Sequence, residues 1–337
     1  MISTDSVILL DVGSTNSRAW LVRGDEILRR ETAAVGVRDS AREGSTARVR
    51  ETVRDLIATL TGAAAARGGA IPVFAAGMIT SPLGLQEVPH VVAPASIDDL
   101  AREAVAFHDA DVSRQPIVLV PGIRTEVFDG DGAAGPADPD ELPFDVMRGE
   151  ETLVCGLIAR GQLGAGSALL NASSHWKLIR VDAERRVAGS RTSLGGEVVH
   201  SVQSGTILSA SLPTGPLDRL STTWLEAGAR AGRRDGLLRA LFGVRLLDQQ
   251  KRADAAERFS FLAGACIAED IDALLASGAL TPGTPIAVSG PAAVPAAWAH
   301  LLSLAGCPAT PLDADTIERG FITGLLAIAE RRAALAH

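Results

Sequence analysis

Several features that mark other classes of protein are missing from this sequence. Tyrosine is absent and aromatic residues make up only 4%, which we attribute, with the abundance of Ala, Gly and Arg, to compositional bias rather than function. No apolar run is long enough to cross a bilayer, and no basic-then-apolar leader opens the chain, so we expect a cytoplasmic protein without a membrane partner. The cysteines are few, odd in number and far apart, which argues against a disulfide framework or a zinc cluster.

Long basic segments are missing as well. The net charge is −8, and a nucleic-acid partner is not expected because phosphate backbones attract basic surfaces. This balance does not exclude ATP, since a metal ion and backbone amides neutralise its phosphates locally. With 337 residues, 47% hydrophobic and 21% charged, the chain has the composition and length of two globular domains.

The most informative stretch is residues 9–18, Leu-Leu-Asp-Val-Gly-Ser-Thr-Asn-Ser-Arg. An apolar run ends at Asp11, a small hydroxyl-rich turn follows, and a second apolar run leaves the turn, which predicts two antiparallel strands joined by a tight turn. Such a turn offers backbone N–H groups and hydroxyls to an anion, and a metal ion could bridge Asp11 to phosphate oxygens. The stretch lacks the Walker lysine and the Rossmann spacing. The alternative is an ordinary β-turn, because these residues are common in turns.

The beginning of the chain is repeated near its middle. Residues 9–15 are echoed by residues 169–174, and in both cases a second apolar run, a charged tip and a third run follow. The third run is closed by Gly36 in the first copy and by Gly195 in the second, at nearly equal spacing. We therefore predict a duplicated domain with one hairpin in each lobe, the two hairpins facing a cleft and holding one nucleotide.

Strands and helices alternate along the chain, which predicts an α/β fold. The expected lobes are residues 1–165 and 166–337, and the final helix, residues 316–334, is a candidate to pack back onto the first lobe. One helix is predicted over residues 97–107. An acidic segment rich in Gly and Pro, residues 129–143, predicts an exposed loop.

Further sequence blocks appear in order along the chain: Gly77-Met78-Ile79-Thr80-Ser81, Val120-Pro121-Gly122-Ile123-Arg124-Thr125, Asp145-Val146-Met147-Arg148-Gly149-Glu150-Glu151-Thr152, residues 257–264 and Arg319-Gly320. Together with the first hairpin they resemble the 2-dehydro-3-deoxygalactonokinase family over nearly the whole chain. The resemblance implies a two-lobed actin-like (ribonuclease H-like) α/β fold with an interlobe cleft. It also implies ATP- and Mg²⁺-dependent phosphorylation of the terminal hydroxyl of a 2-keto-3-deoxy sugar acid, 2-dehydro-3-deoxy-D-galactonate foremost, to the 6-phosphate.

The sequence departs from the family pattern in two places. Leu85 and His90 stand where the family usually has a Trp and a Tyr, on the sugar side. The second hairpin reads Asn-Ala-Ser-Ser-His-Trp-Lys-Leu over residues 171–178, where the family has Pro-Gly-Thr-His-x-Lys-Trp. Because Ala172 carries a methyl group and enters positive φ less freely than Gly, we expect a phosphate to lie farther from the backbone there.

Phosphoryl transfer requires held phosphates and neutralised charge. Asp11 is the candidate residue to hold Mg²⁺, through water, because Mg²⁺ keeps much of its hydration shell. The candidate phosphate ligands lie in the two hairpins: Gly13, Ser14, Thr15 and Asn16 in the first, and Ser173, Ser174, His175 and Lys177 in the second.

The resemblance implies the remaining site residues. Related sugar kinases carry the catalytic base at the start of a helix before the second hairpin, which here means Glu150 or Glu151, with Arg148 beside them as a catalytic or carboxylate-binding cation. A helix N-terminus keeps a carboxylate ionised, and helix capping is the alternative role. The expected sugar-side residues are Arg18, Gly77, Met78, Arg124 and Thr125, and the expected nucleotide-binding residues are Ser289, Gly290 and Pro291.

Two other functions are open on this fold. The altered second hairpin favours a catalytically weak sensor of sugar acids. An exopolyphosphatase-like phosphohydrolase would use the hairpins without a sugar, and the sugar-side blocks argue against it. The expected partners are ATP and a small sugar acid, and the sequence leaves substrate stereochemistry and homo-oligomerisation open.

Overall fold

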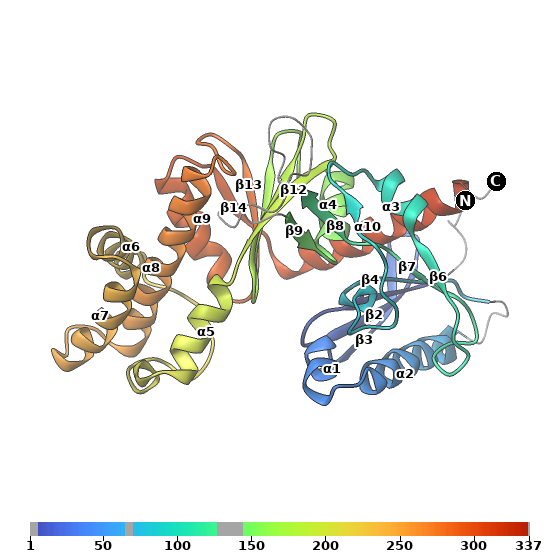
Figure 1. The fold of residues 1–337 in the computed structure, drawn as a ribbon, viewed down its shortest axis with the longest axis horizontal. Helices are drawn as coiled ribbons and strands as arrows, with labels where there is room; N and C mark the ends of the chain where they lie inside the picture. Colours follow the sequence, from blue (N-terminus) through green and yellow to red (C-terminus); the bar gives the residue numbers. More distant parts are fainter. Residues whose placement is uncertain (1–5, 65–69, 127–143, 336–337) are drawn as a thin grey trace, which may run out of the picture. The chain divides into compact units, whose positions relative to one another are not determined.

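The structure is a computed structural model that describes residues 6–64, 70–126 and 144–335. The chain divides into two compact units (Figure 1). Unit 1 comprises Met1–Gln162, Asp182–Gly189 and Ile317–His337, and unit 2 comprises Leu163–Val181 and Ser190–Thr316. The exposed loop predicted at residues 129–143 lies outside the described residues.

Unit 1 is built on a six-stranded sheet with the order β3-β2-β1-β4-β7-β6. The first three strands are antiparallel, β1, β4 and β7 run parallel, and β6 closes the edge antiparallel to β7. The strands are β1 (Val7–Val12), β2 (Ser17–Arg23), β3 (Glu26–Ala33), β4 (Val73–Gly77), β6 (Val105–Phe107) and β7 (Ile117–Leu119). The predicted hairpin at residues 9–18 is confirmed, with Val12 opposite Ser17 across the turn.

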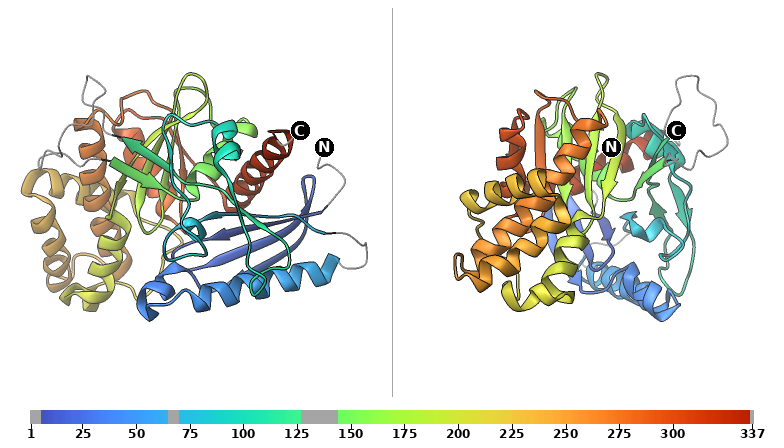
Figure 2. Two further views of the ribbon diagram at one scale, coloured as in Figure 1. Left: turned by 45° about the vertical axis from the view of Figure 1, so that its right-hand side comes forward. Right: turned by 60° about the vertical axis from the view of Figure 1, so that its left-hand side comes forward.

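The two faces of this sheet differ because side chains alternate along each strand. Ile8, Leu10 and Val12 join a buried cluster with Val53 and Leu60 of α2. In the left view of Figure 2, α2 runs along one face of the blue strands. Leu9, Asp11 and Trp20 consequently lie on the opposite face. The helices of unit 1 are α1 (Val37–Glu43), α2 (Ala47–Ala64), η2 (Met78–Thr80), α3 (Ile97–Glu103) and α4 (Glu150–Ala159). Helix α10 (Ala314–Leu335) belongs to unit 1 from Ile317 onward.

The prediction of a single helix over residues 97–107 is wrong for the C-terminal part of that segment. A capping box between Ser96 and Asp99 starts α3, but the helix stops at Glu103 and the chain becomes strand β6. The antiparallel pairing of Phe107 with Ile117 draws these residues into the sheet edge, so tertiary pairing overrides local helical periodicity. A separate three-stranded sheet of unit 1 contains β5 (Val91–Val92), β8 (Ile123–Glu126) and β9 (Phe144–Met147).

Unit 2 repeats the strand order of unit 1. Its sheet, β12-β11-β10-β13-β14, has the connectivity of β3-β2-β1-β4-β7, which confirms the duplicated α/β architecture (Figure 1). Its strands are β10 (Ala168–Ala172), β11 (Trp176–Val181), β13 (Ile286–Ser289) and β14 (Ala309–Pro311), together with β12 (Val187–Ser193), which belongs to unit 2 from Ser190 onward. The register repeats as well: Asp11 lies opposite Arg18, and Asn171 lies opposite Lys177.

The helices of unit 2 pack around one buried cluster. The central helix α8 begins at a capping box between Asp254 and Glu257 and buries a stripe that includes Phe261 and Ile267. At the sheet, the rings of Trp176 and Trp298 meet edge to face at 5.0 Å. The helices are α5 (Gly195–Gly205), η3 (Ile207–Ser211), α6 (Thr222–Asp235), α7 (Leu237–Gln249), α8 (Ala255–Ala276) and α9 (Val294–Leu304). No helix among the described residues is long and apolar enough to cross a membrane.

In unit 1, helices α4 and α10 approach each other through glycines. A Cβ atom on Gly156 would lie 1.7 Å from the carbonyl oxygen of Gly320, and one on Gly324 would lie 1.9 Å from that of Thr152. Both positions therefore require the absence of a side chain. Because α4 begins at Glu150, this contact sets where the candidate base lies relative to the sheet.

Gly324→Ala should consequently lower the free energy of unfolding by about 1–3 kcal/mol or more, since the added methyl overlaps the backbone of α4. The matched control is Gly62→Ala in α2, where an added methyl meets nothing within 4 Å. That change should raise the free energy of unfolding by up to about 1 kcal/mol through helix propensity. Chemical denaturation of both variants measures the difference, and equal stabilities would contradict close α4–α10 packing.

Candidate active site

The carboxylate of Asp11 lies near the end of the fully buried strand β1 and is itself 8% exposed. Arg18, directly opposite on β2, donates a hydrogen bond from Nη2 to Asp11 Oδ2 at 2.5 Å. Burial raises the pKa of Asp11 above its ordinary value, the positive charge of Arg18 opposes this rise, and the nearby charge of Glu150 adds to it. The arrangement is a buried anion whose described counter-charge is one half-exposed arginine.

Two glycines lie directly beside Asp11. Gly77, at the end of β4, has φ +94°, and a Cβ atom there would lie 2.7 Å from the carbonyl oxygen of Val12 and 3.1 Å from Asp11 Oδ1. Gly149, with φ +108°, would bring a Cβ atom within 3.2 Å of Gly77 Cα and 4.0 Å of Asp11 Oδ1. The ends of β1, β4 and β9 thus meet at one carboxylate, and the predicted sugar-side residue Gly77 is adjacent to it.

The turn of the first hairpin is fixed by backbone contacts. Gly13 N–H donates to the carbonyl of Asn16, and the carbonyls of Gly13 and Ser14 accept from Val37 and Arg38 at the start of α1. Gly36 packs so closely that a Cβ atom would lie 2.5 Å from the backbone of Ser14 and Thr15. Thr15 and Asn16 are exposed, and Gly13 and Ser14 are partly exposed. All four predicted phosphate ligands therefore lie on an accessible, braced turn.

The structure separates the two candidate bases. Glu151 is fully buried, and its carboxylate accepts hydrogen bonds from Gly149 N–H at 2.8 and 2.9 Å and from the Thr152 hydroxyl at 3.2 Å. Burial and the charge of Glu150 raise the pKa of Glu151 to about 7. Glu150 is partly exposed and acts electrostatically on both Asp11 and Glu151. Glu151 caps the helix start, whereas Glu150 is the accessible acid of the pair.

Arg148 is held by the segment that follows β4. Its Nη1 donates to Thr80 Oγ1 at 2.8 Å and to the carbonyl of Val88 at 3.0 Å, and Nη2 lies 3.5 Å from His90 Nδ1. Burial lowers the pKa of Arg148, against the opposing charge of Glu151 and Glu87. The guanidinium therefore ties the segment after β4 to the start of α4, and a catalytic role for it stays a prediction.

The other predicted sugar-side residues lie in different environments. Met78 packs against the core cluster of unit 1, and the side chain of Thr125 lies against Gly189. Arg124 forms an ion pair with Glu126, and its Cζ lies 5.9 Å from the centroid of the Phe144 ring. The Nε–H group of Arg124 is buried and donates to no acceptor among the described residues.

In unit 2 the second hairpin and the segment after β13 come together. Ser289 Oγ donates to Asn171 Oδ1 at 3.1 Å, and a Cβ atom on Gly290 would lie 2.8 Å from the carbonyl oxygen of Ala172. Ala172 ends β10 opposite Trp176, in extended backbone, so the expected difficulty with positive φ does not arise. The predicted nucleotide-binding residues are thus adjacent to the predicted phosphate-binding turn.

The turn of the second hairpin is braced like the first. The carbonyl of Ser174 accepts from Glu197 N–H at 2.9 Å, and a Cβ atom on Gly196 would lie 2.2 Å from the carbonyl oxygen of Ser173. His175 Nε2 lies 3.5 Å from Glu197 Oε1. Lys177 is buried on β11, opposite Asn171.

A cavity of about 620 Å³ opens beside this turn within unit 2. Ser173 and Ser174 lie at its polar side and Pro291 borders it, while Trp176 and Phe259 belong to its predominantly apolar wall. Its size is that of a small-molecule site. Other lining residues, His200, Gln203 and the segment 213–217, carried no recognisable motif and were not predicted from the sequence.

The residues around Asp11 suit a magnesium ion with few protein ligands. No group of three His, Cys, Asp or Glu side chains that could hold a metal occurs among the described residues. Mg²⁺ in phosphotransferases needs only one or two carboxylates, with water and phosphate oxygens completing the shell. Asp11, with the closely packed Gly77 and Gly149 beside it, provides such a donor.

Comparisons with known proteins agree with this geometry. The sequence pattern of the family described as 2-keto-3-deoxy-galactonokinase matches residues 11–328. The 2-dehydro-3-deoxygalactonokinase of Escherichia coli is 26% identical over 330 residues, 97% of this chain and 98% of that protein. A probable 2-dehydro-3-deoxygalactonokinase, DgoK1 of Rhizobium meliloti, is 28% identical over 285 residues, 83% of this chain and 84% of that protein.

A solved structure shares the fold. The crystal structure of a Sinorhizobium meliloti protein assigned as a 2-dehydro-3-deoxygalactonokinase superposes with a TM-score of 0.74 at 24% identity, covering 96% of both chains. This chain therefore shares the fold of that protein, and the duplicated α/β architecture expected from the sequence is confirmed.

The buried Glu151 should make stability depend on pH. Between about pH 4.5 and 7 its carboxyl group stays protonated in the folded protein and ionises in the unfolded chain. The contribution of protonated Glu151 to the free energy of unfolding is complete below about pH 4.5 and is lost as pH rises through about 7. In Glu151→Gln this loss should shrink by roughly 2–3 kcal/mol, as urea denaturation between pH 4.5 and 8 would show. An unchanged pH dependence would contradict the burial of an ionisable Glu151.

Proposed function

We propose a specific reaction for this chain, which belongs to the 2-keto-3-deoxy-galactonokinase family and is a carbohydrate kinase acting on a sugar acid. The reaction is transfer of the terminal phosphate of ATP to the terminal hydroxyl of 2-dehydro-3-deoxy-D-galactonate, which yields the 6-phosphate. The observation that carries the proposal is the cluster of Asp11, Gly77, Gly149 and Glu150, in which two carboxylates and two closely packed glycines lie together in unit 1. The three free cysteines suit a reducing cytoplasm.

Charge neutralisation is the first requirement of phosphoryl transfer. Mg²⁺ bound at Asp11 would neutralise charge on the phosphates during transfer. Gly13, Ser14, Thr15 and Asn16 would hold phosphate oxygens through backbone N–H groups and hydroxyls. The braced carbonyls of Gly13 and Ser14 support this role, because the turn does not need to reorganise when an anion binds.

Glu150 is the base in this proposal. The sugar hydroxyl must lose a proton as it attacks, and a positioned carboxylate accepts it. Glu150 is partly exposed at the first turn of α4, so its carboxylate is accessible to a substrate. Glu151 is a poor candidate because its oxygens are occupied by Gly149 N–H and it is inaccessible. Glu151 instead fixes the start of α4 and thereby the position of its neighbour.

We assign the adenosine of ATP to the cavity of unit 2. Its volume and apolar wall suit a purine, and Ser173 and Ser174 would contact phosphate at its polar side. Ser289 and Gly290 support the turn from behind through Asn171 and Ala172, and Pro291 borders the cavity. His175 and Lys177 of the same hairpin would lie near the phosphates of this nucleotide.

Arg124 is the proposed anchor for the carboxylate of the sugar acid. An arginine binds a carboxylate through two parallel N–H groups, and Arg124 has a buried Nε without a described acceptor. Arg148 is already committed to Thr80 and Val88, so its contribution is to hold the sugar-side loop. Arg18 and Met78 would border the sugar.

The reaction is tested by ADP release with Mg·ATP and a panel of 2-keto-3-deoxy acids. We expect release that depends on the sugar and is fastest with the galactonate-derived acid, and Asp11→Ala should abolish turnover while retaining the fold. Sugar binding without ADP release would instead identify a sensor, and ADP release without sugar a phosphohydrolase. Full turnover by Asp11→Ala would remove the metal role.

Glu150→Gln should lower kcat by about 10²–10⁴, the usual contribution of a positioned base, with little change in KM. Glu151→Gln, the same change one residue later, is the matched control and should have a much smaller effect on kcat. Steady-state kinetics of both variants at saturating ATP decide between them. A larger loss in the Glu151 variant would reverse the assignment.

A further inference from the structure

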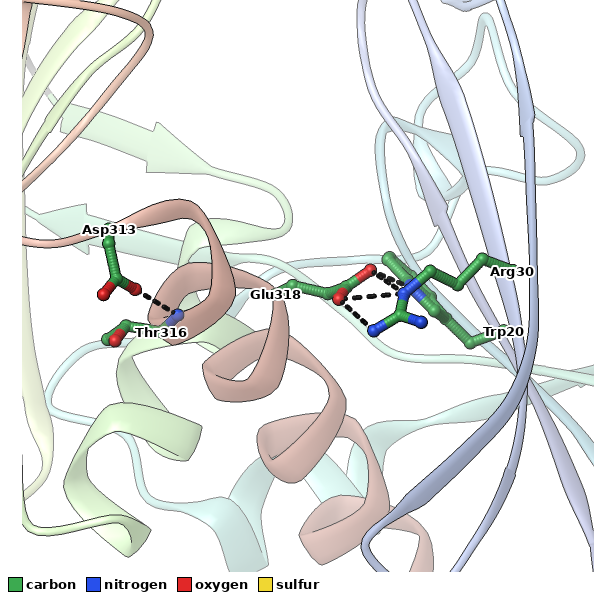
Figure 3. Close-up of polar contacts among 5 residues, drawn as sticks. All are labelled: Trp20, Arg30, Asp313, Thr316 and Glu318. Carbon is green, nitrogen blue, oxygen red and sulfur yellow. Dashed lines mark hydrogen bonds and ion pairs between the residues drawn. The ribbon is translucent and has the colours of Figure 1, made fainter.

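A chain of contacts leads from Asp11 to the final helix within unit 1. The guanidinium of Arg18 bonds Asp11, and its Cζ lies 5.9 Å from the centroid of the Trp20 ring. Trp20 Nε1 donates to Glu318 Oε1 at 2.7 Å, and Arg30 donates to both oxygens of Glu318 at 2.9–3.0 Å (Figure 3). Each residue in this series therefore contacts the next one: Asp11, Arg18, Trp20, Glu318 and Arg30.

Sheet register places these groups on one face. Arg18 and Trp20 are two residues apart on β2, so their side chains point the same way. Asp11 is directly opposite Arg18 on β1, and Arg30 is directly opposite Trp20 on β3. Helix α10 contributes the fifth member from the other end of the chain.

Trp20 and Glu318 are fixed by packing and by several hydrogen bonds, whereas the described contacts of Arg18 are one hydrogen-bonded ion pair and one ring contact. The Trp20 side chain is 2% exposed and packs against the Phe321 ring at 5.8 Å. Glu318 is held by three donor contacts from Arg30 and by Trp20, and these hydrogen bonds lower its pKa. The Arg18 side chain is 49% exposed. Its charge also acts on Glu318, so this cation lies in the field of two carboxylates.

We propose that Arg18 is the counter-ion of Asp11 in the absence of metal and is replaced by Mg²⁺ when the metal binds. In this exchange Arg18 moves along the Trp20 ring toward Glu318. Trp20 and Glu318 are therefore positioning residues. The inference rests on the proposed metal role of Asp11. It follows from charge: Arg18 and a divalent cation cannot share one carboxylate without repulsion. An aromatic face and a second carboxylate on the same side of the sheet give the displaced guanidinium a place to remain.

The exchange has two consequences for the protein. Without metal, the buried Asp11 is never left uncompensated, which would be costly for an isolated buried charge. With metal, Arg18 stays beside the phosphate-binding turn instead of swinging into solvent. Glu318 thus influences metal binding only through the position of Arg18.

The test uses Mn²⁺ as the probe, with free Mn²⁺ measured by electron paramagnetic resonance on the full chain without nucleotide. Arg18→Met should bind Mn²⁺ about tenfold more tightly than the unmodified protein, since Asp11 no longer has a competing cation. Arg18→Lys, which keeps the charge, should restore the weaker binding. Asp11→Asn defines the site and should abolish binding.

Glu318→Gln should weaken Mn²⁺ binding, because Arg18 loses its alternative carboxylate and stays on Asp11. In the Arg18→Met background the same change should have no effect, as expected if Glu318 acts through Arg18. Arg331→Gln, which removes the ion pair of α10 with Asp98 at 2.8 Å, is the matched control and should leave binding unchanged. Addition of Mg²⁺ should also change the fluorescence of Trp20, seen as a difference from Trp20→Phe that disappears in Arg18→Met.

The outcomes separate the exchange from the metal role itself. If Asp11→Asn abolishes binding but Arg18→Met binds Mn²⁺ no more tightly, the exchange is overturned and the metal role stands. If Glu318→Gln weakens binding equally with and without Arg18, Glu318 acts directly and its positioning role is overturned. If Asp11→Asn binds as the unmodified protein does, the metal role fails and the exchange fails with it.

Discussion

The buried carboxylate of Asp11 is the constraint on which the rest of unit 1 depends. A charge at the end of a fully buried strand is expensive unless a counter-charge lies beside it, and Arg18 supplies one directly across the hairpin. The residues around it must also be small, which explains Gly77 and Gly149 at the ends of their segments. This buried anion, whose described partner is half-exposed, is where we place the proposed cation.

The two units share one strand arrangement but carry different functional side chains at equivalent positions. In both units a hairpin turn is braced by a close glycine and by the first N–H groups of the following helix. At equivalent register, unit 1 has Asp11 opposite Arg18, whereas unit 2 has Asn171 opposite Lys177. The first pair carries an acid suited to a metal ion. The second replaces that acid with an amide held by Ser289, beside a cavity of nucleotide size.

Glu150 and Glu151, the two neighbouring acids of α4, could not be distinguished from the sequence. Both are compatible with a base and with a helix cap, and local pattern treats them alike. Packing distinguishes them, because the helix start turns Glu151 inward onto Gly149 N–H and leaves Glu150 partly exposed. The same holds for Arg148, whose three neighbours belong to the segment after β4 and are distant in sequence. Residues 105–107 form a strand instead of the predicted helix for an equally non-local reason, because they pair with β7 at the sheet edge.

The sequence by itself determined the first hairpin, the acid near the end of its first strand, the repeat of that hairpin and the α/β class, because hydrophobic periodicity and turn residues are local properties. Only the tertiary structure decided which acid of α4 is accessible, where the cavity of unit 2 lies and which groups surround Arg18. The contact between Trp20 and Glu318 joins residues 298 positions apart. No local pattern encodes such a contact, because it arises when a terminal helix packs on a sheet formed by the first strands of the chain.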